Sequence, residues 1–277
     1  SNVSKSDVRK LLMDLVVKSK FYKYIIEPIS YLEEESHFSE VYDSLLYFKN
    51  MNIRQVRPLL LSLFGLKERD EIDSITFIKL VKHLENFYFQ YISVMRNGTN
   101  TIEKFIYNYS SKFESDFNND LIQEFIDKSY NYLPSKELFI SNFDNLGYSN
   151  KNKNFKNTSN KKLINYILSS FENHFNTTQE TRILNFTVEH IKSDSETDDC
   201  SRMIGNLLPL AQKINEKAGN KDFTEKIQLY KRSNFELVKH FITRYENNLW
   251  DDSSIKIRTK KFAELAYNTL WKCKNES

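Results

Sequence analysis

Apolar residues recur every three or four positions through the first half of the chain, from Ser4 to about Asp144. The pattern is clear in VRKLLMDLVVKS (residues 8–19) and in ITFIKLVKHLENFYFQYISVM (residues 75–95). This period is typical of amphipathic helices that bury one stripe in a core. We therefore expect a helical array of six or seven members, in which the apolar side of residues 8–19 is packed.

A polar segment interrupts this pattern at GYSNKNKNFKNTSN, residues 147–160. It has almost no apolar residues, so it is not expected to bury a face, and its composition is typical of a loop or linker. We therefore expect two domains, a helical domain at 1–150 and a second domain at 151–277. A protease is expected to cut this segment first.

The second half mixes two patterns. A helix is expected at 160–175, with Asn160 as its N-cap, and a short β-branched strand at 183–191. A polar loop follows, then a second apolar run at 202–211, and helix resumes near Lys221 and continues to the C-terminus. The chain has only 5 Gly and 4 Pro, which favours long helices over a many-stranded sheet. The predicted fold is mostly α, with one short two-stranded hairpin.

Composition excludes several classes. The 40 Lys and Arg are nearly balanced by 37 Asp and Glu, so the net charge of +3 does not by itself indicate a nucleic-acid binder. Cys200 and Cys273 are too few for a zinc knuckle or a disulfide framework, which fits a reducing cytosol. No apolar stretch approaches the ~20 residues of a membrane span, and the N-terminus is not a secretory signal. We expect a soluble, cytoplasmic protein.

Glu189 and His190 stand side by side at the end of the predicted strand. Hydrolysis of a phosphodiester needs a base that deprotonates water and a divalent cation that neutralises charge on the phosphate. An imidazole can act as the base, and a neighbouring carboxylate can bind the cation. Because hard cations take oxygen ligands, a second carboxylate or amide oxygen is expected nearby. The downstream segment offers Asn206 and Asn215.

The order Glu-His-Ile, then IGNL, then a second Asn nine residues after the first, then NKDFTEKIQLYKRS, resembles the HNH (ββα-metal) nuclease motif. It is most similar to the C-terminal domain of GmrSD-type modification-dependent restriction endonucleases, over about residues 160–274. The resemblance implies a helix-flanked ββα core in which His190 is the general base, Glu189 and Asn215 bind one Mg²⁺ or Mn²⁺, and Asn206 orients the loop and His190. It also implies DNA, modified or unmodified, as the substrate, and a role in phage defence. A nucleotide-hydrolysing N-terminal region or partner subunit would lie outside this chain.

Basic residues cluster after this motif. A charge run is most often the solvated face of a helix, but in a nuclease it would lie against phosphates. On that interpretation Lys226 and Arg232 are the preferred contacts. The predicted DNA-binding residues are Lys213, Lys221, Lys226, Lys231 and Arg232.

Two other functions compete with a metal-dependent DNA endonuclease. A nucleic-acid-binding or regulatory module could keep this fold without cleaving DNA. A helical adaptor for protein partners would explain residues 1–144, but it leaves the ordered Glu, His, Asn and Asn set as a coincidence.

Overall fold

The computed structural model describes residues 4–34, 39–176 and 185–273, and these divide into two compact units. The first holds the residues up to Ile92 together with Arg96–Leu133 and Cys273. The second holds Ser93–Met95 and Pro134–Lys272. This division falls earlier than the predicted boundary at residue 150. The chain is mostly helical with one two-stranded hairpin, as predicted.

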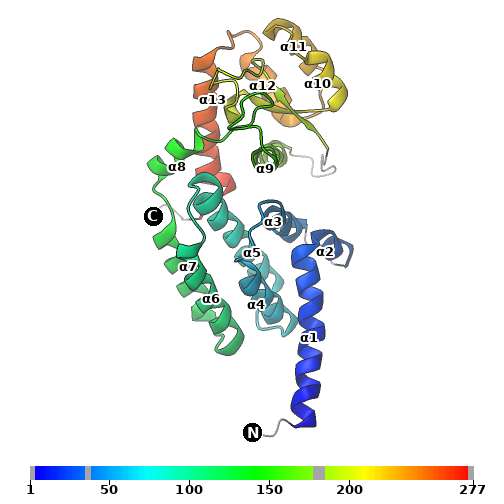
Figure 1. Cartoon of the computed structure of the whole chain (residues 1–277), viewed down its shortest axis with the longest axis vertical. Coiled ribbons are helices and arrows are strands. Elements are labelled where there is room, and N and C mark those ends of the chain that lie inside the picture. The colour runs from blue at the N-terminus through cyan, green and yellow to red at the C-terminus, as the bar shows by residue number, and fades with distance from the viewer. Residues whose placement is uncertain (1–3, 35–38, 177–184, 274–277) are drawn as a thin grey trace. The chain divides into compact units, whose positions relative to one another are not determined.

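The first unit is the predicted helical array (Figure 1). Its core is rich in aromatic side chains that pack edge-on and stacked, such as Phe87 on Tyr91 and Phe105 on Phe125. The helices are α1 (Lys5–Ile26), α2 (Pro28–Glu34), α3 (Ser39–Asn50), α4 (Arg57–Glu68), α5 (Ser74–Tyr88), α6 (Asn100–Ser115) and α7 (Asn119–Ser129).

Helix α1 differs from its predicted burial. Only Phe21, Tyr24 and Ile25 of this helix are buried, near its C-terminal end. The predicted apolar stripe lies in the preceding turns, where the described residues leave it exposed. The prediction was therefore wrong for Val8, Leu11, Leu12, Leu15 and Val16.

The second unit places a hairpin among helices (Figure 1). Strands β1 (Thr187–His190) and β2 (Leu207–Leu210) pair antiparallel, with Glu189 opposite Leu208 and His190 opposite Leu207. The predicted strand began at Ile183, but Ile183 and Leu184 lie outside the described residues. The helices are α8 (Lys136–Phe143), α9 (Thr158–Phe175), α10 (Gln212–Ala218), α11 (Phe223–Tyr230), α12 (Glu236–Tyr245) and α13 (Asp252–Leu265).

Helix ends follow local capping chemistry. Asn157, rather than the predicted Asn160, caps α9 by accepting a hydrogen bond from the Asn160 N–H. Asp222 caps α11 in the same way.

Helix α10 begins at Gln212, earlier than the predicted return to helix near Lys221, and it follows directly on β2. The order in the chain is therefore strand, long loop, strand and helix.

The segment predicted to be a linker packs into the second unit. Tyr148 and Ser149 are buried, and the Tyr148 N–H donates to the carbonyl of Arg202. A Cβ on Gly147 would lie 2.3 Å from that carbonyl oxygen, so only glycine allows this approach. Residues 148–157 form a loop, as predicted, but because the start of this loop is packed it is not a linker free of the core.

Gly205, in the turn before β2, is equally constrained. A Cβ there would lie 2.3 Å from the Ile255 carbonyl oxygen and from Thr259 Oγ1 on α13. The Gly205 N–H instead donates to Thr259 Oγ1, and the Gly205 carbonyl accepts from Arg258. This close approach ties the start of β2 to α13.

Among the described residues, no helix is both long and apolar enough to cross a membrane.

Candidate active site

An open cavity of about 390 Å³ lies beside β1 in the second unit. Its walls come from β1, from α10 and the turn after it, from the loop after β1, and from the segment before α9 together with the first turn of α9. Three of the four predicted site residues line it, namely Glu189, His190 and Asn215. Its other lining residues are Tyr148, Asn150, Lys151, Lys161, Phe186, Thr187, Val188, Ser193, Asp194, Gly219 and Asn220.

His190 ends β1 and is buried, with its ring held in one orientation. Its Nε2 lies 2.9 Å from the backbone carbonyl oxygen of Tyr148. A carbonyl oxygen only accepts hydrogen bonds, so in the neutral ring Nε2 carries the proton and Nδ1 carries the lone pair. The residue that fixes this tautomer comes from the segment that composition alone had marked as a linker.

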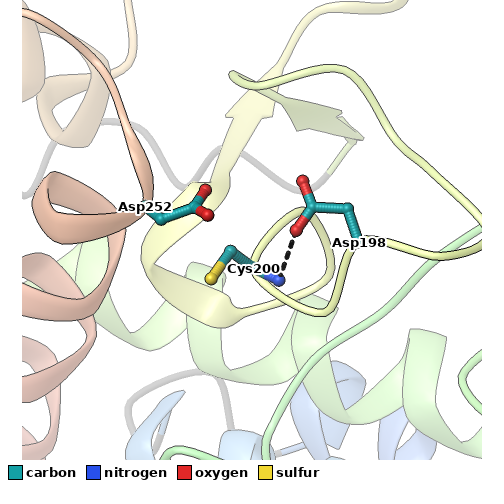
Figure 2. Close-up of side chains that lie close together, drawn as sticks. All are labelled: Asp198, Cys200 and Asp252. Atoms are coloured by element: carbon teal, nitrogen blue, oxygen red, sulfur yellow. Dashed lines mark hydrogen bonds between the residues drawn. The ribbon is translucent and has the colours of Figure 1, made fainter.

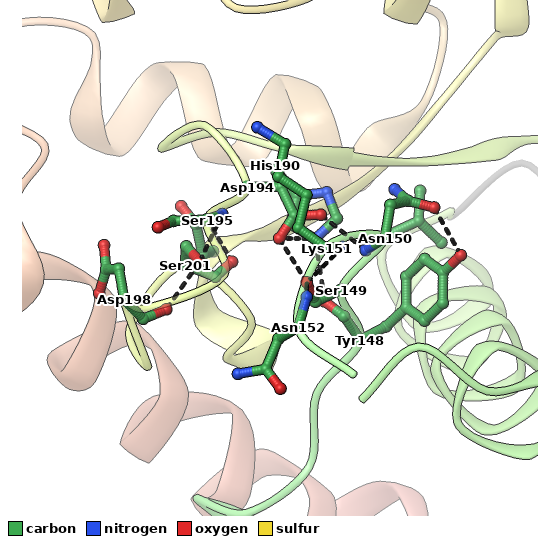
Figure 3. Close-up of polar contacts among 12 residues, drawn as sticks. Tyr148, Ser149, Asn150, Lys151, Asn152, His190, Asp194, Ser195, Asp198 and Ser201 are labelled. Carbon is green, nitrogen blue, oxygen red and sulfur yellow. Dashed lines mark hydrogen bonds and ion pairs between the residues drawn. The ribbon is translucent and has the colours of Figure 1, made fainter. Parts of the chain in front are cut away.

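Asp194 joins that segment to the loop after His190 (Figure 3). One carboxylate oxygen accepts from Ser149 Oγ and the other from the Asn150 N–H, both at 2.6 Å. The first of these oxygens also lies 3.9 Å from His190 Nε2. Asp194 therefore positions the carbonyl that orients His190 and adds negative charge on the Nε2 side.

Asn206 holds the two ends of the same loop together. Its Oδ1 accepts from the Lys192 N–H and from Trp250 Nε1, while its Nδ2 donates to the carbonyls of Lys192 and Ser201. The side chain is fully buried and its amide capacity is used by these four bonds. Because Asn206 does not line the cavity, it can act only by positioning the loop that carries Asp194.

Glu189 points toward α11. Its Oε1 accepts from Lys226 Nζ at 2.8 Å and from Tyr230 Oη at 2.7 Å, and the residue is only 3% exposed. Burial is the first reason that the pKa of Tyr230 lies well above its ordinary value, and the nearby Glu189 charge raises it further. Both bonds use Oε1, so a cation in the cavity would have to bind Glu189 through Oε2.

Asn215 reaches back from α10 to β1. Its Nδ2 donates to Thr187 Oγ1 at 2.8 Å and to the Val188 carbonyl at 3.2 Å. Because that carbonyl cannot donate, it fixes which end of the amide is nitrogen. The oxygen Oδ1 is left without a donor from the described residues, as a ligand oxygen for a hard cation would be.

The predicted DNA contacts separate into two groups. Lys213, Lys221, Lys231 and Arg232 are exposed, whereas Lys226 is fully buried, with its Nζ bonded to Glu189 and to the His190 carbonyl. The prediction that Lys226 contacts phosphate is corrected, because its ammonium is enclosed and already paired. Lys151 and Lys161 were missed. They line the cavity, and the only signal for them was the Lys-rich composition of residues 147–162.

A second group of candidate metal ligands, Asp198, Cys200 and Asp252, lies near the far end of the loop (Figure 2). The ammonium of Lys192 already bridges it, 2.6 Å from Asp198 and 2.5 Å from Asp252. Burial raises the pKa of the Cys200 thiol, and the Asp252 charge adds to that effect, so the thiolate is disfavoured. Since Lys192 supplies the positive charge, we assign no metal to these residues.

Part of the chain matches a known protein family. Residues 140–265 match the family of GmrSD restriction endonucleases, C-terminal domain. The match confirms the resemblance found in the sequence: these residues are similar to a family of nucleases. It lies within the second unit and contains Glu189, His190, Asn206 and Asn215. A search of curated proteins finds no match to the chain.

Proposed function

We propose that the second unit is a metal-dependent DNA endonuclease of the HNH type. One observation carries the proposal: the Tyr148 carbonyl fixes the His190 tautomer, so that Nδ1 is the basic nitrogen of a ring that lines the same cavity as Glu189 and Asn215. The chain order of β1, β2 and α10 supports it, because this is the strand, strand and helix order that the ββα description names.

In the proposed reaction, His190 Nδ1 accepts a proton from a water molecule as that oxygen attacks phosphorus. The bond from phosphorus to the leaving sugar oxygen breaks, and that oxygen takes up a proton from solvent. As the ring becomes positively charged, the Nε2–H bond to Tyr148 is retained and Asp194 lies 3.9 Å from Nε2. Asn206 holds in place the loop that carries Asp194.

The residues present fit a divalent cation of the hard class. Glu189 and Asn215 are oxygen donors in one cavity, and the fixed amide of Asn215 leaves Oδ1 for this purpose. When bound, Mg²⁺ or Mn²⁺ would neutralise charge on the phosphate and the leaving oxygen. Asn215→Ala is expected to raise the half-saturating Mg²⁺ concentration by about tenfold or more, with activity recovering at higher Mg²⁺.

That prediction is checked by titrating cleavage with Mg²⁺ for wild type, Asn215→Ala and a matched control. Gln212→Ala is the control, because Gln212 lies on the same helix, is exposed and bonds only Glu216 among the described residues. An unchanged metal requirement in Asn215→Ala would remove Asn215 from the ligand set.

Lys151 and Lys161 are the proposed phosphate contacts at the cavity. Replacing both by alanine should weaken DNA binding and make it less sensitive to salt, by a slope of about 1.8 for two lost contacts. The measurement is DNA affinity against salt concentration. Lys153→Ala with Lys162→Ala removes the same charge from exposed neighbours that do not line the cavity, and it should keep the wild-type slope. Equal slopes in both double variants would show that only net charge matters.

The family match suggests a role for the proposed activity. We propose that the domain is the cleaving part of a cytoplasmic restriction system against phage or other foreign DNA, and that the DNA recognised carries a modification. A nucleotide-hydrolysing region or partner subunit would then control cleavage. These statements rest on the match of residues 140–265.

One observation favours the alternative of a module that binds DNA without cutting it. The proposed ligand Glu189 already pairs with the buried ammonium of Lys226. A carboxylate neutralised in this way attracts a cation less strongly, because much of its charge is already compensated.

Cleavage in ¹⁸O-labelled water decides between these two functions. A hydrolase should place one ¹⁸O atom in the terminal phosphate for each bond cut in a short duplex, as seen by mass spectrometry, and only with a divalent cation. A protein that binds the duplex but yields no labelled product under Mg²⁺ or Mn²⁺ would instead be the binding module.

A further inference from the structure

A second cavity of about 400 Å³ lies among α9, α12, α13 and the π-helical turn Ala266–Leu270 that continues α13. It shares no lining residue with the cavity at His190. Its lining is strongly basic, and Glu264 is the one acidic residue in it among the described residues. The basic and imidazole groups that line it are His174, His240, Arg244, Arg258 and Lys261.

Arg258 is the unusual member of this group. Its side chain is 3% exposed, and its Nη1 donates to the carbonyls of Gly205 and Leu207 at 2.6 and 3.1 Å. Its other terminal nitrogen, Nη2, is buried without a hydrogen-bond partner among the described residues. A buried donor left without an acceptor costs free energy, so it points to a ligand that supplies one.

No carboxylate of the described residues compensates the charge of Arg258. Its guanidinium lies over the rings of Phe241 and Phe262, with 5.0 and 4.4 Å to the centroids, and makes no ion pair with a described residue. Burial lowers the pKa of Arg258 to about 9, which still leaves it charged at neutral pH. Nη1 therefore has a structural role through its bonds to two backbone carbonyls, whereas Nη2 has no partner among the described residues.

Two further cations stand at the same cavity. Arg244 on α12 and Lys261 on α13 are exposed, and neither pairs with an acidic group of the described residues. By contrast Lys239, on the same helix as Arg244, pairs with Glu236. Burial lowers the pKa of His240, and the charges of Arg244, Arg258 and Lys261 lower it further. The half-buried His240 ring thus reports a positive local potential.

We propose that this cavity is a binding site for a phosphate group, in which Arg244, Arg258 and Lys261 supply the positive charge and His240 a neutral donor. Three cations around one concave site match the charge and the acceptor oxygens of a phosphate, and an oxygen at Arg258 would satisfy Nη2. The site is independent of the proposed cleavage at His190. The phosphate could belong to the DNA backbone or to a small phosphorylated ligand, since both present the same chemistry.

The pKa of His240 provides the test, because an anion beside it must raise this value. The chain has five histidines, so His240 can be followed by NMR and assigned with His240→Asn. The full chain is titrated with pH in chloride alone, with inorganic phosphate, and with a short DNA duplex, at constant ionic strength. The anion should raise the pKa of His240, whereas chloride should leave it below the ordinary value.

The critical variant is Arg244→Gln with Lys261→Gln, because Arg258→Gln would also remove the bonds to Gly205 and Leu207 and threaten folding. This double variant should raise the pKa of His240 in chloride and weaken phosphate binding by about tenfold or more. Its matched control is Lys239→Gln with Lys256→Gln, which removes the same charge from exposed positions on the same two helices outside the cavity.

A response to the duplex would assign the group to the DNA backbone, and a response to inorganic phosphate alone would assign it to a small ligand. Either supports the site if it is lost in the critical variant and kept in the control. If neither anion shifts the pKa of His240, or if both double variants respond alike, the proposal is overturned. Because no cleavage is measured, failure here leaves the nuclease proposal untouched.

Discussion

His190→Ala is expected to slow DNA cleavage by roughly 10² to 10⁴-fold, the usual loss when a general base is removed. DNA affinity should change little, because the proposed phosphate contacts lie on other residues. The expectation follows from the bond between His190 Nε2 and the Tyr148 carbonyl, which leaves Nδ1 as the ring nitrogen with a lone pair to accept a proton. Plasmid nicking rates and duplex affinity, measured on the same preparations, separate the two effects.

The matched control is His83→Ala. His83 is half-buried and bonded to Ser129, but it belongs to the first unit and takes no part in the proposed chemistry. Burial lowers the pKa of His83 to about 4, so it is neutral at working pH and its loss removes no charge. If His190→Ala and His83→Ala cut equally well, the active site lies elsewhere.

Lys226→Met is expected to destabilise the second unit by about 3–5 kcal/mol, because it leaves the buried Glu189 carboxylate without its counter-charge. The Lys226 side chain is fully buried, so solvent cannot replace the ammonium. Both tryptophans, Trp250 and Trp271, are buried in this unit, so denaturant unfolding followed by their fluorescence reports this unit specifically.

The double variant Glu189→Gln with Lys226→Met removes both charges and should recover much of that loss, since no unpaired charge remains. Lys221→Met tests the same substitution at an exposed site, where the effect should stay within about 0.5 kcal/mol. A loss below about 1 kcal/mol for Lys226→Met alone would show that Glu189 does not depend on this pair.

Periodicity correctly predicted a mostly helical chain with one hairpin, because apolar spacing determines which segments can bury a face. It could not tell which stripe finds a partner. The apolar residues of α1 repeat as regularly as those of α5, yet the described residues leave them exposed while Phe77, Leu80 and Leu84 are buried. Burial depends on what packs opposite a helix, and local sequence does not contain that information.

The order of residues in the motif predicted that Glu189, His190 and Asn215 lie close together, and all three line one cavity. The prediction succeeds because the motif spacing places them on adjacent elements. The partners that orient them were not predictable in this way. The Tyr148 carbonyl orients His190 through a backbone oxygen, which no side-chain pattern marks. Asp194 bonds Ser149, which lies 45 residues away in the chain, and composition does not reveal such a contact.

Lys226 shows the limit most clearly. A run of charges after the motif indicated a solvated or DNA-facing surface, but Lys226 lies on the side of α11 that also buries Ile227 and Tyr230. The sequence carried the signal in the position of Glu189, whose buried carboxylate needs a cation. Only the three-dimensional pairing identifies which lysine supplies it.

Metal-activated nicking of supercoiled plasmid, compared for wild type and His190→Ala at equal protein and metal concentrations, is the most direct test of the proposed active site. Wild type should nick with Mg²⁺ or Mn²⁺ and stop on chelation, while His190→Ala binds the plasmid but leaves it supercoiled. A wild-type protein that binds DNA and never nicks it with either ion, or a variant that nicks at the same rate, would contradict the assignment of His190 as the base of a nuclease.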